Sequence, residues 1–317
     1  MSSPSVDTSK CVASSSSSMK EEMEKSSNKK VSTSCAQKVE HCNNDSVSNN
    51  TASISRSGIN TISDSLGRVD ISNDDDDKLF QDPPPKVDCP ICLQPIPYID
   101  EIFGVTKAYM ACCGKSICSG CMIAARKEMI KGNIKRWCPF CRVPLHKTDA
   151  EALKRLKKRA KLGDAQAHLT LGHAYRNGGM GLTQDFNKTI ELWRKAAELG
   201  STNAHFNLAT AYHNGFYGVE QDIDKALQYW TLSAIGGDET GRHNLGAIEK
   251  ANGNIDRAYK HWMIAARCGE DDSLKMVGEG YKAGHVTKDE YTNTLRAYQN
   301  CRNEMKSRER DIAAAQR

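Results

Sequence analysis

The stretch HLTLGHAYRNGGMGLTQDFNKTIELWRKAAELG, residues 168–200, is the first clear copy of a repeat. It aligns, 37 residues further on, with HFNLATAYHNGFYGVEQDIDKALQYWTLSAIGG at residues 205–237. A third copy at residues 243–269 has lost five residues from its central loop, and a weaker fourth copy begins at Asp272. Self-similarity with a period of about 30 to 40 residues is typical of solenoids, so the C-terminal half is expected to be one.

The recurring positions predict two helices in each copy. Leu171, Gly172 and Tyr175 follow helical spacing in the first, and Trp193 with a following Ala pair marks the second. The recurring Leu, Tyr, Trp and Ala side chains are expected to form the core. Glycines are expected to end the second helices, and aspartates to cap the helices that follow. The glycines are Gly200, Gly237 and Gly269, and the aspartates are Asp164, Asp238 and Asp271.

These copies resemble Sel-one-like repeats, which are relatives of the tetratricopeptide repeat. The motifs that carry the resemblance are LGHAYRNGGMG, QDIDKALQYW and WRKAAELG. The resemblance covers about residues 150–300 and implies an all-α helical-repeat solenoid with a concave face that binds a protein partner. We assign residues 148–300 to these repeats and residues 301–317 to a charged helix that caps their far end.

The rest of the composition limits the class of protein. Residues 1–85 are rich in Ser and Asn and carry too little apolar surface to fold, so we expect a disordered tail. The 317-residue chain has 44 Lys and Arg against 39 Asp and Glu, and a net charge of +5 does not call for nucleic acid. Without a run of 18 apolar residues or a secretory signal, we expect a cytoplasmic or nuclear protein that does not enter membranes.

A basic stretch, KRLKKRAK at residues 154–161, has two interpretations. It is either a patch for nuclear import or nucleic acid, or the solvated face of an amphipathic helix. Apolar residues interleave with the charges, which favours the helix. These residues are Ala152, Leu153, Leu156, Ala160 and Leu162.

Eight of the 13 cysteines fall within residues 89–141, inside a segment that we assign to residues 86–147. Six of them form C-x2-C pairs, which present two sulfurs to one side of a tetrahedral ion. Eight thiols can close two four-coordinate zinc sites, each contributing on the order of 10 kcal/mol to folding. The eight are Cys89, Cys92, Cys112, Cys113, Cys118, Cys121, Cys138 and Cys141.

Other uses of these cysteines are less favoured. Four cysteines also hold an iron–sulfur cluster, but the regular pairs suit two zinc ions better. A catalytic thiol needs a base, and no His lies between Cys89 and Cys141. A redox C-x2-C pair is excluded less firmly, although so many pairs together favour metal.

The cysteine segment resembles the RING finger in CPIC, CGKSICSGC and CPFCR, over residues 89–142. This resemblance implies a small zinc-stapled α+β module that binds two zinc ions with alternating ligand pairs. According to this resemblance, the first zinc is held by Cys89, Cys92, Cys118 and Cys121. The second zinc is held by Cys112, Cys113, Cys138 and Cys141.

One position departs from the family pattern. RING fingers usually place a His ligand where this chain has Lys115, and a protonated Lys does not ligate zinc. Cys112 is the natural substitute, and His146 is a weaker one. Adjacent side chains point to opposite faces of a strand, so Cys112 and Cys113 need a sharp turn, which Gly114 permits.

The RING resemblance implies a ubiquitin-protein transferase that orients a ubiquitin-charged conjugating enzyme and forms no covalent intermediate. The family's enzyme-contacting positions correspond to Ile91, Pro139 and Arg142, of which the arginine bridges enzyme and ubiquitin. A tryptophan found in many active members is replaced by Ala125, and Trp137 is a candidate to supply apolar surface instead.

Three functions follow from these observations. The first is a RING-type ubiquitin ligase whose repeats bind a substrate or an adaptor. The alternative is a non-catalytic scaffold for protein–protein interaction, built from the zinc finger and the helical repeats. A nucleic-acid-binding zinc protein rests on residues 154–161 alone and is the weakest of the three.

Overall fold

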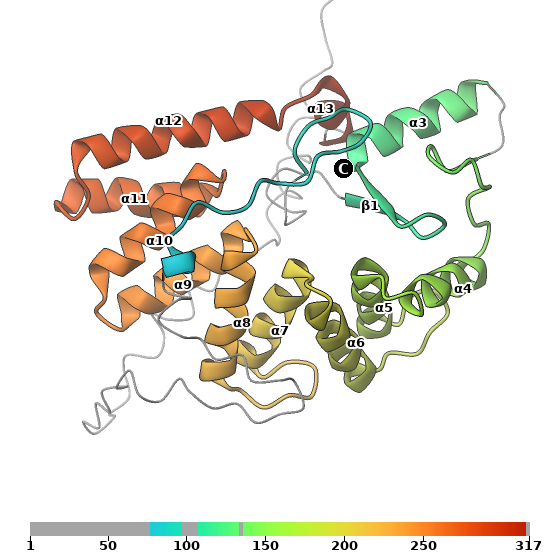
Figure 1. The fold of residues 1–317 in the computed structure, drawn as a ribbon, viewed down its shortest axis with the longest axis horizontal. Coiled ribbons are helices and arrows are strands. Elements are labelled where there is room, and N and C mark those ends of the chain that lie inside the picture. The colour runs from blue at the N-terminus through green and yellow to red at the C-terminus, as the bar shows by residue number, and fades with distance from the viewer. Residues whose placement is uncertain (1–76, 97–106, 133–135, 315–317) are drawn as a thin grey trace, which may run out of the picture. The chain divides into compact units, whose positions relative to one another are not determined.

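The computed structural model describes residues 77–96, 107–132 and 136–314, which Figure 1 draws in colour. Most of the tail predicted to be disordered lies outside these ranges. Residues 77–85 depart from that prediction, because Leu79 is 5% exposed and belongs to an apolar cluster of the repeats. Burying one leucine stabilises a segment by about 2 kcal/mol, which helps to order a short stretch.

The cysteine-rich segment folds as a hairpin followed by a helix. Strand β1 (Lys107–Met110) pairs antiparallel with β2 (Lys115–Cys118), and α3 (Ser119–Lys131) begins directly after β2. Besides cysteines, few side chains fill its buried core: Ile96, Met110, Ile117 and Met122. A module of this size with so small an apolar core needs a further source of stability.

The C-terminal part is a solenoid of helix pairs, as the recurring motifs predicted (Figure 1). Each pair packs on the next through α6 with α7, α8 with α9, and α10 with α11. The pairs are α5 (Ala165–Asn177) with α6 (Phe186–Glu198), α7 (Thr202–Asn214) with α8 (Ile223–Ile235), α9 (Glu239–Ala251) with α10 (Ile255–Arg267), and α11 (Asp271–Ala283) with α12 (Lys288–Glu304).

The predicted N-caps are confirmed at two of three positions. The side chains of Asp164 and Asp238 accept backbone hydrogen bonds at the starts of α5 and α9. The prediction for Asp271 is wrong, because Glu270 is the N-cap of α11 and accepts a 2.7 Å hydrogen bond from the Ser273 amide. The longer Glu side chain makes the capping contact one residue earlier than the expected Asp.

Small residues let the two helices of a repeat approach closely. A Cβ atom on Gly172 would lie 2.5 Å from the Trp193 ring, and one on Gly246 would lie 2.6 Å from the Trp262 ring. Both tryptophans are 1% exposed, which confirms their predicted core role. The glycines predicted to follow the second helices all have positive φ: Gly200, Gly237 and Gly269.

Helix α4 (Asp149–Ala160) carries the basic stretch and packs on α5. Ala152 and Leu156 are buried, while Lys157 and Lys158 are exposed, as expected for an amphipathic helix. Leu162 departs from the prediction, because the helix ends before it and leaves it 68% exposed. Within the residues described, no helix has the length and apolar character required to span a membrane.

The C-terminal helix α13 (Arg308–Ala314) packs on α3. The assignment of residues 301–317 to a cap on the repeats stays a prediction. A Cβ atom on Gly120 would lie 2.7 Å from the backbone of Glu309 and of Arg310. Arg310 is 2% exposed and donates a 2.8 Å hydrogen bond to the Pro95 carbonyl. Carbonyl oxygens of the cysteine-rich module therefore accept hydrogen bonds from this helix.

Candidate metal centre

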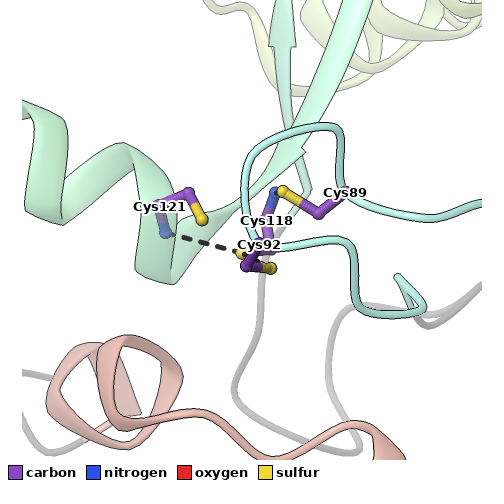
Figure 2. Close-up of side chains that lie close together, drawn as sticks. All are labelled: Cys89, Cys92, Cys118 and Cys121. Carbon is purple, nitrogen blue, oxygen red and sulfur yellow. Dashed lines mark hydrogen bonds between the residues drawn. The ribbon is translucent and has the colours of Figure 1, made fainter.

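Four cysteines from three elements converge in a first cluster (Figure 2). Cys89 and Cys92 lie on a tight turn, closed by a 2.8 Å hydrogen bond from the Leu93 amide to the Cys89 carbonyl. Cys118 ends β2, and Cys121 lies in the first turn of α3. Their four sulfur atoms all lie within 4.8 Å of one another.

Backbone amides point at the sulfurs of the first cluster. The Cys118 amide donates to Cys89 Sγ at 3.5 Å. The Cys121 amide donates to Cys118 Sγ at 3.4 Å (Figure 2). Burial disfavours a charged thiol, but amide donors including that of Cys118 outweigh it and lower the pKa of Cys89 to about 7. The turn is thus arranged to stabilise a thiolate.

A second cluster gathers the other four cysteines, whose sulfurs also lie within 4.8 Å of one another. Its members are Cys112, Cys113, Cys138 and Cys141. The chain turns sharply beside the first two, because the amides of Cys113 and Gly114 both donate to the Met110 carbonyl, at 3.1 and 2.8 Å. Gly114 adopts a φ of +77°, which permits the turn that adjacent ligands require.

The two C-P-x-C turns repeat the same local structure. The Arg142 amide donates to the Cys138 carbonyl at 3.1 Å, which mirrors the hydrogen bond from Leu93 to Cys89. Leu93 and Arg142 both have a φ of +56°. An isolated antiparallel bridge flanks each turn, Asp88 with Pro95 and Trp137 with Pro144.

The geometry of both clusters fits a tetrahedral ion. A Zn–S bond of about 2.3 Å implies sulfur–sulfur distances of about 3.8 Å in a tetrahedral site. One sulfur–sulfur distance in each cluster is close to this value, 3.9 Å between Cys92 and Cys118 and 3.8 Å between Cys113 and Cys138, and the others are at most 4.8 Å. Four thiol ligands fill the coordination sphere, so each cluster suits a structural ion and not a hydrolytic one.

Four thiolates so close together repel one another, and a bound cation would offset that repulsion. Burial and neighbouring thiols raise the pKa of Cys112 and of Cys121 well above the ordinary value, so the clusters resist carrying four thiolates unaided. A divalent ion offsets this repulsion when it binds. Metal binding is then coupled to proton release and weakens in acid.

Three residues bear on which side chain takes the place of the usual His ligand at the second cluster. Lys115 lies outside the clusters, with its ammonium 5.1 Å from the centre of the Phe140 ring. His146 is exposed and belongs to neither cluster. Cys112 is the residue brought beside the other three sulfurs, although the ligand assignment stays a prediction.

The predicted enzyme-contacting residues lie on or beside the metal-site turns. Ile91 is 44% exposed between the first two cysteines, and Arg142 is exposed after the last one. Pro139 is half-buried, as is Ala125 on α3. Trp137 is 38% exposed, so part of its ring is available to a partner. What these side chains contact stays a prediction.

Sequence reasoning missed Arg310 beside the first cluster. Its guanidinium donates to Cys92 Sγ at 3.7 Å and to the Gln94 and Pro95 carbonyls at 3.1 and 2.8 Å. A buried cation at this position offsets the negative charge of metal-bound thiolates. Its only sequence signal is a charged C-terminal helix, which does not reveal that α13 returns to α3.

A second network joins the hairpin to the first repeat. The Tyr109 hydroxyl donates to the Asp164 carboxylate at 2.7 Å, and Arg159 donates to the same oxygen at 2.9 and 2.7 Å. Burial, followed by the bond to Asp164, raises the pKa of Tyr109 well above its usual value. The N-cap of α5 thus also anchors β1.

Comparison with known proteins identifies the repeats. Residues 165–201 and 202–238 each match the Sel1 repeat, so the chain contains Sel1 repeats as the motifs predicted. No curated protein matches the chain. The RING resemblance rests on the cysteines and their neighbours alone.

Solved structures similar to this chain include proteins with Sel1 repeats. One is c5321, a protective antigen of uropathogenic Escherichia coli with an SLR fold, at 31% identity, 49% coverage of this chain, 33% of that chain and a TM-score of 0.41. Another is a Sel1 repeat protein from Oxalobacter formigenes, at 26% identity, with coverages of 47% and 64% and a TM-score of 0.41. This chain therefore spans less than two thirds of either protein.

Proposed function

We propose that this chain is a scaffold for protein–protein interaction with two binding parts. The Sel1 repeats bind a protein partner, and the eight cysteines hold two zinc ions that fold a second binding module. The observation that carries the proposal is the stack of matched Sel1 repeats, since such solenoids offer extended surfaces to partners. The two closed four-sulfur clusters support a structural role for the metal.

One surface of the repeats suits a partner. An open pocket of about 500 Å³ runs along α6 and the loop before α8, and it is lined by charged and apolar side chains. Its lining includes Ile190, Glu191, Lys195, Glu198, Tyr217 and Val219. A reversible protein interface has about the same mixture of polar and apolar atoms as the rest of a protein surface, so this lining is compatible with a protein partner.

The scaffold proposal is tested by affinity purification with the full chain as bait and quantitative mass spectrometry. Glu191→Arg should lose partners bound at the α6 pocket, whereas Glu279→Arg, an exposed charge on α11, is the matched control. Cys89→Ser with Cys92→Ser should lose partners of the zinc module only. Identical partner sets for all four chains, or no partners, would refute the two-part scaffold.

We propose a second, more specific function for the cysteine-rich module, that of a RING-type ubiquitin ligase. Support comes from Ile91 and Arg142, both exposed on metal-site turns at the positions that the resemblance assigns to the conjugating enzyme. The module's contribution is orientation: Ile91 packs on the enzyme, and Arg142 donates hydrogen bonds to the enzyme and ubiquitin. Zinc, when bound, fixes the two turns that carry these side chains.

The ligase proposal is tested by ubiquitin discharge onto free lysine from a panel of charged conjugating enzymes, with the full chain. Discharge should accelerate with the natural sequence and fall to background with Ile91→Ala or Arg142→Ala. Ile130→Ala and Arg136→Ala, both exposed, are the matched controls and should keep activity. A zinc-loaded chain that accelerates no enzyme of the panel would leave the scaffold function alone.

A further inference from the structure

Residues 77–86 lead into the cysteine-rich segment, which begins at Lys86, but they contact helices of the repeats. Leu79 lies in a buried cluster built from α7, α8 and α9, and Phe80 packs against it. The Phe80 ring lies 4.8 Å from the His261 ring and 4.9 Å from the Arg257 guanidinium. The other members of the cluster are Ala209, Tyr212, Ala226, Trp230, Ala234 and Leu245.

Polar contacts anchor the segment at both ends. Arg242 on α9 donates hydrogen bonds to the Leu79 carbonyl and, at 2.8 Å, to the Ala234 carbonyl. Lys86 donates to Glu239 Oε1 at 3.3 Å and to the Cys268 carbonyl at 2.9 Å. Glu239 is 1% exposed and Arg242 is 2% exposed. The segment therefore supplies partners to two charges buried in the repeats.

These two charges distinguish the third repeat from the others. At the first position of the leading helix, the four repeats carry Ala165, Thr202, Glu239 and Asp271. At the fourth position, they carry His168, His205, Arg242 and Leu274. An acid and a base occur together only in the third of these helices, where the segment binds. Core packing common to all repeats does not explain that pair.

The segment is held at its two ends and exposed between them. Leu79 and Lys86 are seven positions apart, whereas Gln81 and Asp82 are exposed. Three prolines at residues 83–85 restrict the backbone and reduce the entropy lost on binding. Two anchors on either side of an exposed, stiff stretch are typical of a bound peptide.

We propose that helices α7 to α10 form a peptide-recognition site that the chain's own residues 77–86 occupy. Its external ligand is a protein segment with an aliphatic–aromatic pair on one turn, acidic residues around that pair, and a lysine seven positions after the aliphatic residue. The charges agree, because Arg257, Lys260 and Arg267 lie near the segment, whose sequence continues an acidic block at residues 74–77. Such a partner exchanges with the chain's own segment. This proposal requires neither ligase activity nor a metal.

The test uses fluorescence anisotropy with a labelled synthetic peptide of residues 74–88 and the full chain. Leu79→Ala with Phe80→Ala removes the internal competitor, so the peptide should bind this variant far more tightly than the natural chain. An effective concentration on the order of 1 mM for the tethered segment, against a peptide dissociation constant of about 10 µM, gives about a 100-fold difference. Val87→Ala, at a side chain 70% exposed, is the control and should bind the peptide like the natural chain.

Further variants make the proposal specific. A peptide with Leu79 and Phe80 replaced by Ala should not bind any chain. Adding Arg242→Leu, the residue of the fourth repeat, to the double variant should reduce peptide binding at least tenfold. Equal peptide affinity for the natural chain and the double variant would overturn the proposal. Two further outcomes would overturn it, because both would mean that residues 77–86 are part of the folded core. One is a double variant that fails to fold. The other is hydrogen exchange of the amides of residues 77–86 only when the whole chain unfolds.

Discussion

Arg310→Ala removes a buried cation from the first cysteine cluster. Zinc with four thiolates carries a net charge of about −2, and the guanidinium lies 3.7 Å from Cys92 Sγ. At an effective dielectric constant near 20, one pair of unit charges at this distance is worth about 4 to 5 kcal/mol before desolvation. Desolvation of the arginine offsets part of this energy, and removing such a partner typically weakens metal binding about 10- to 100-fold. We expect that loss at the first cluster only.

The assay is competition between the zinc-loaded full chain and a chromophoric chelator. Arg310→Ala should give one zinc that leaves about 10- to 100-fold more readily and one that is unchanged. Arg308→Ala, an exposed arginine two residues earlier, is the matched control and should behave like the natural chain. Arg310→Lys should retain part of the effect because it keeps the charge. Unchanged affinity at both sites in a folded Arg310→Ala chain would refute the role assigned to this side chain.

Further predictions concern stability and the second cluster. Gly246→Ala places a Cβ 2.6 Å from the Trp262 ring and should lower the free energy of unfolding by about 1–3 kcal/mol in urea titrations; no loss would contradict the close helix approach. Burial lowers the pKa of His205 from 6.5 to about 4. Because the unfolded chain takes up this proton more readily, the free energy of unfolding should fall by at most about 3 kcal/mol as the pH drops from 6.5 towards 4. His205→Phe should make that decline shallower, and an NMR-measured pKa near 6.5 would refute the reasoning. Gly114→Ala puts a side chain at a φ of +77° and its Cβ against the Arg159 guanidinium, so it should weaken zinc at the second cluster and leave the first unchanged, as measured by the chelator assay.

The repeats were largely predictable because their signals are local and recur. Trp193 and its counterparts fix the spacing of the second helices, and glycines such as Gly200 mark their ends. The misplaced cap at Asp271 differs by one residue, because Glu270 performs the same function. The sequence therefore predicts that a helix has an N-cap more reliably than it predicts which of two neighbouring acidic residues forms it.

The grouping of the eight cysteines into two clusters was predictable from their spacing, provided that the chain turns sharply at one point. Cys112 and Cys113 required a sharp turn to face one ion, and Gly114 provides it with a positive φ. The C-x2-C turns at Cys89 and Cys138 share one structure because they share one local sequence pattern. Turns that depend on a few neighbouring residues are therefore predictable from the sequence.

Long-range contacts were not predictable from one sequence. Arg310 reaches Cys92 from 218 positions away, and Lys86 reaches Glu239 from 153 positions away. Neither residue lies in a motif, and alternating charges in the C-terminal segment read equally well as a solvated cap. Such pairs depend on how whole elements pack, which hydrophobic periodicity does not encode.

We propose that the eight clustered cysteines form two independent, closed zinc sites in a chain that contains Sel1 repeats. Native mass spectrometry of the full chain tests it most directly. We expect two zinc ions in the natural chain, and one each in the Cys89→Ser, Cys92→Ser variant and in the Cys113→Ser, Cys138→Ser variant. A natural chain that carries no zinc or only one ion, under conditions that keep thiols reduced, would contradict the claim.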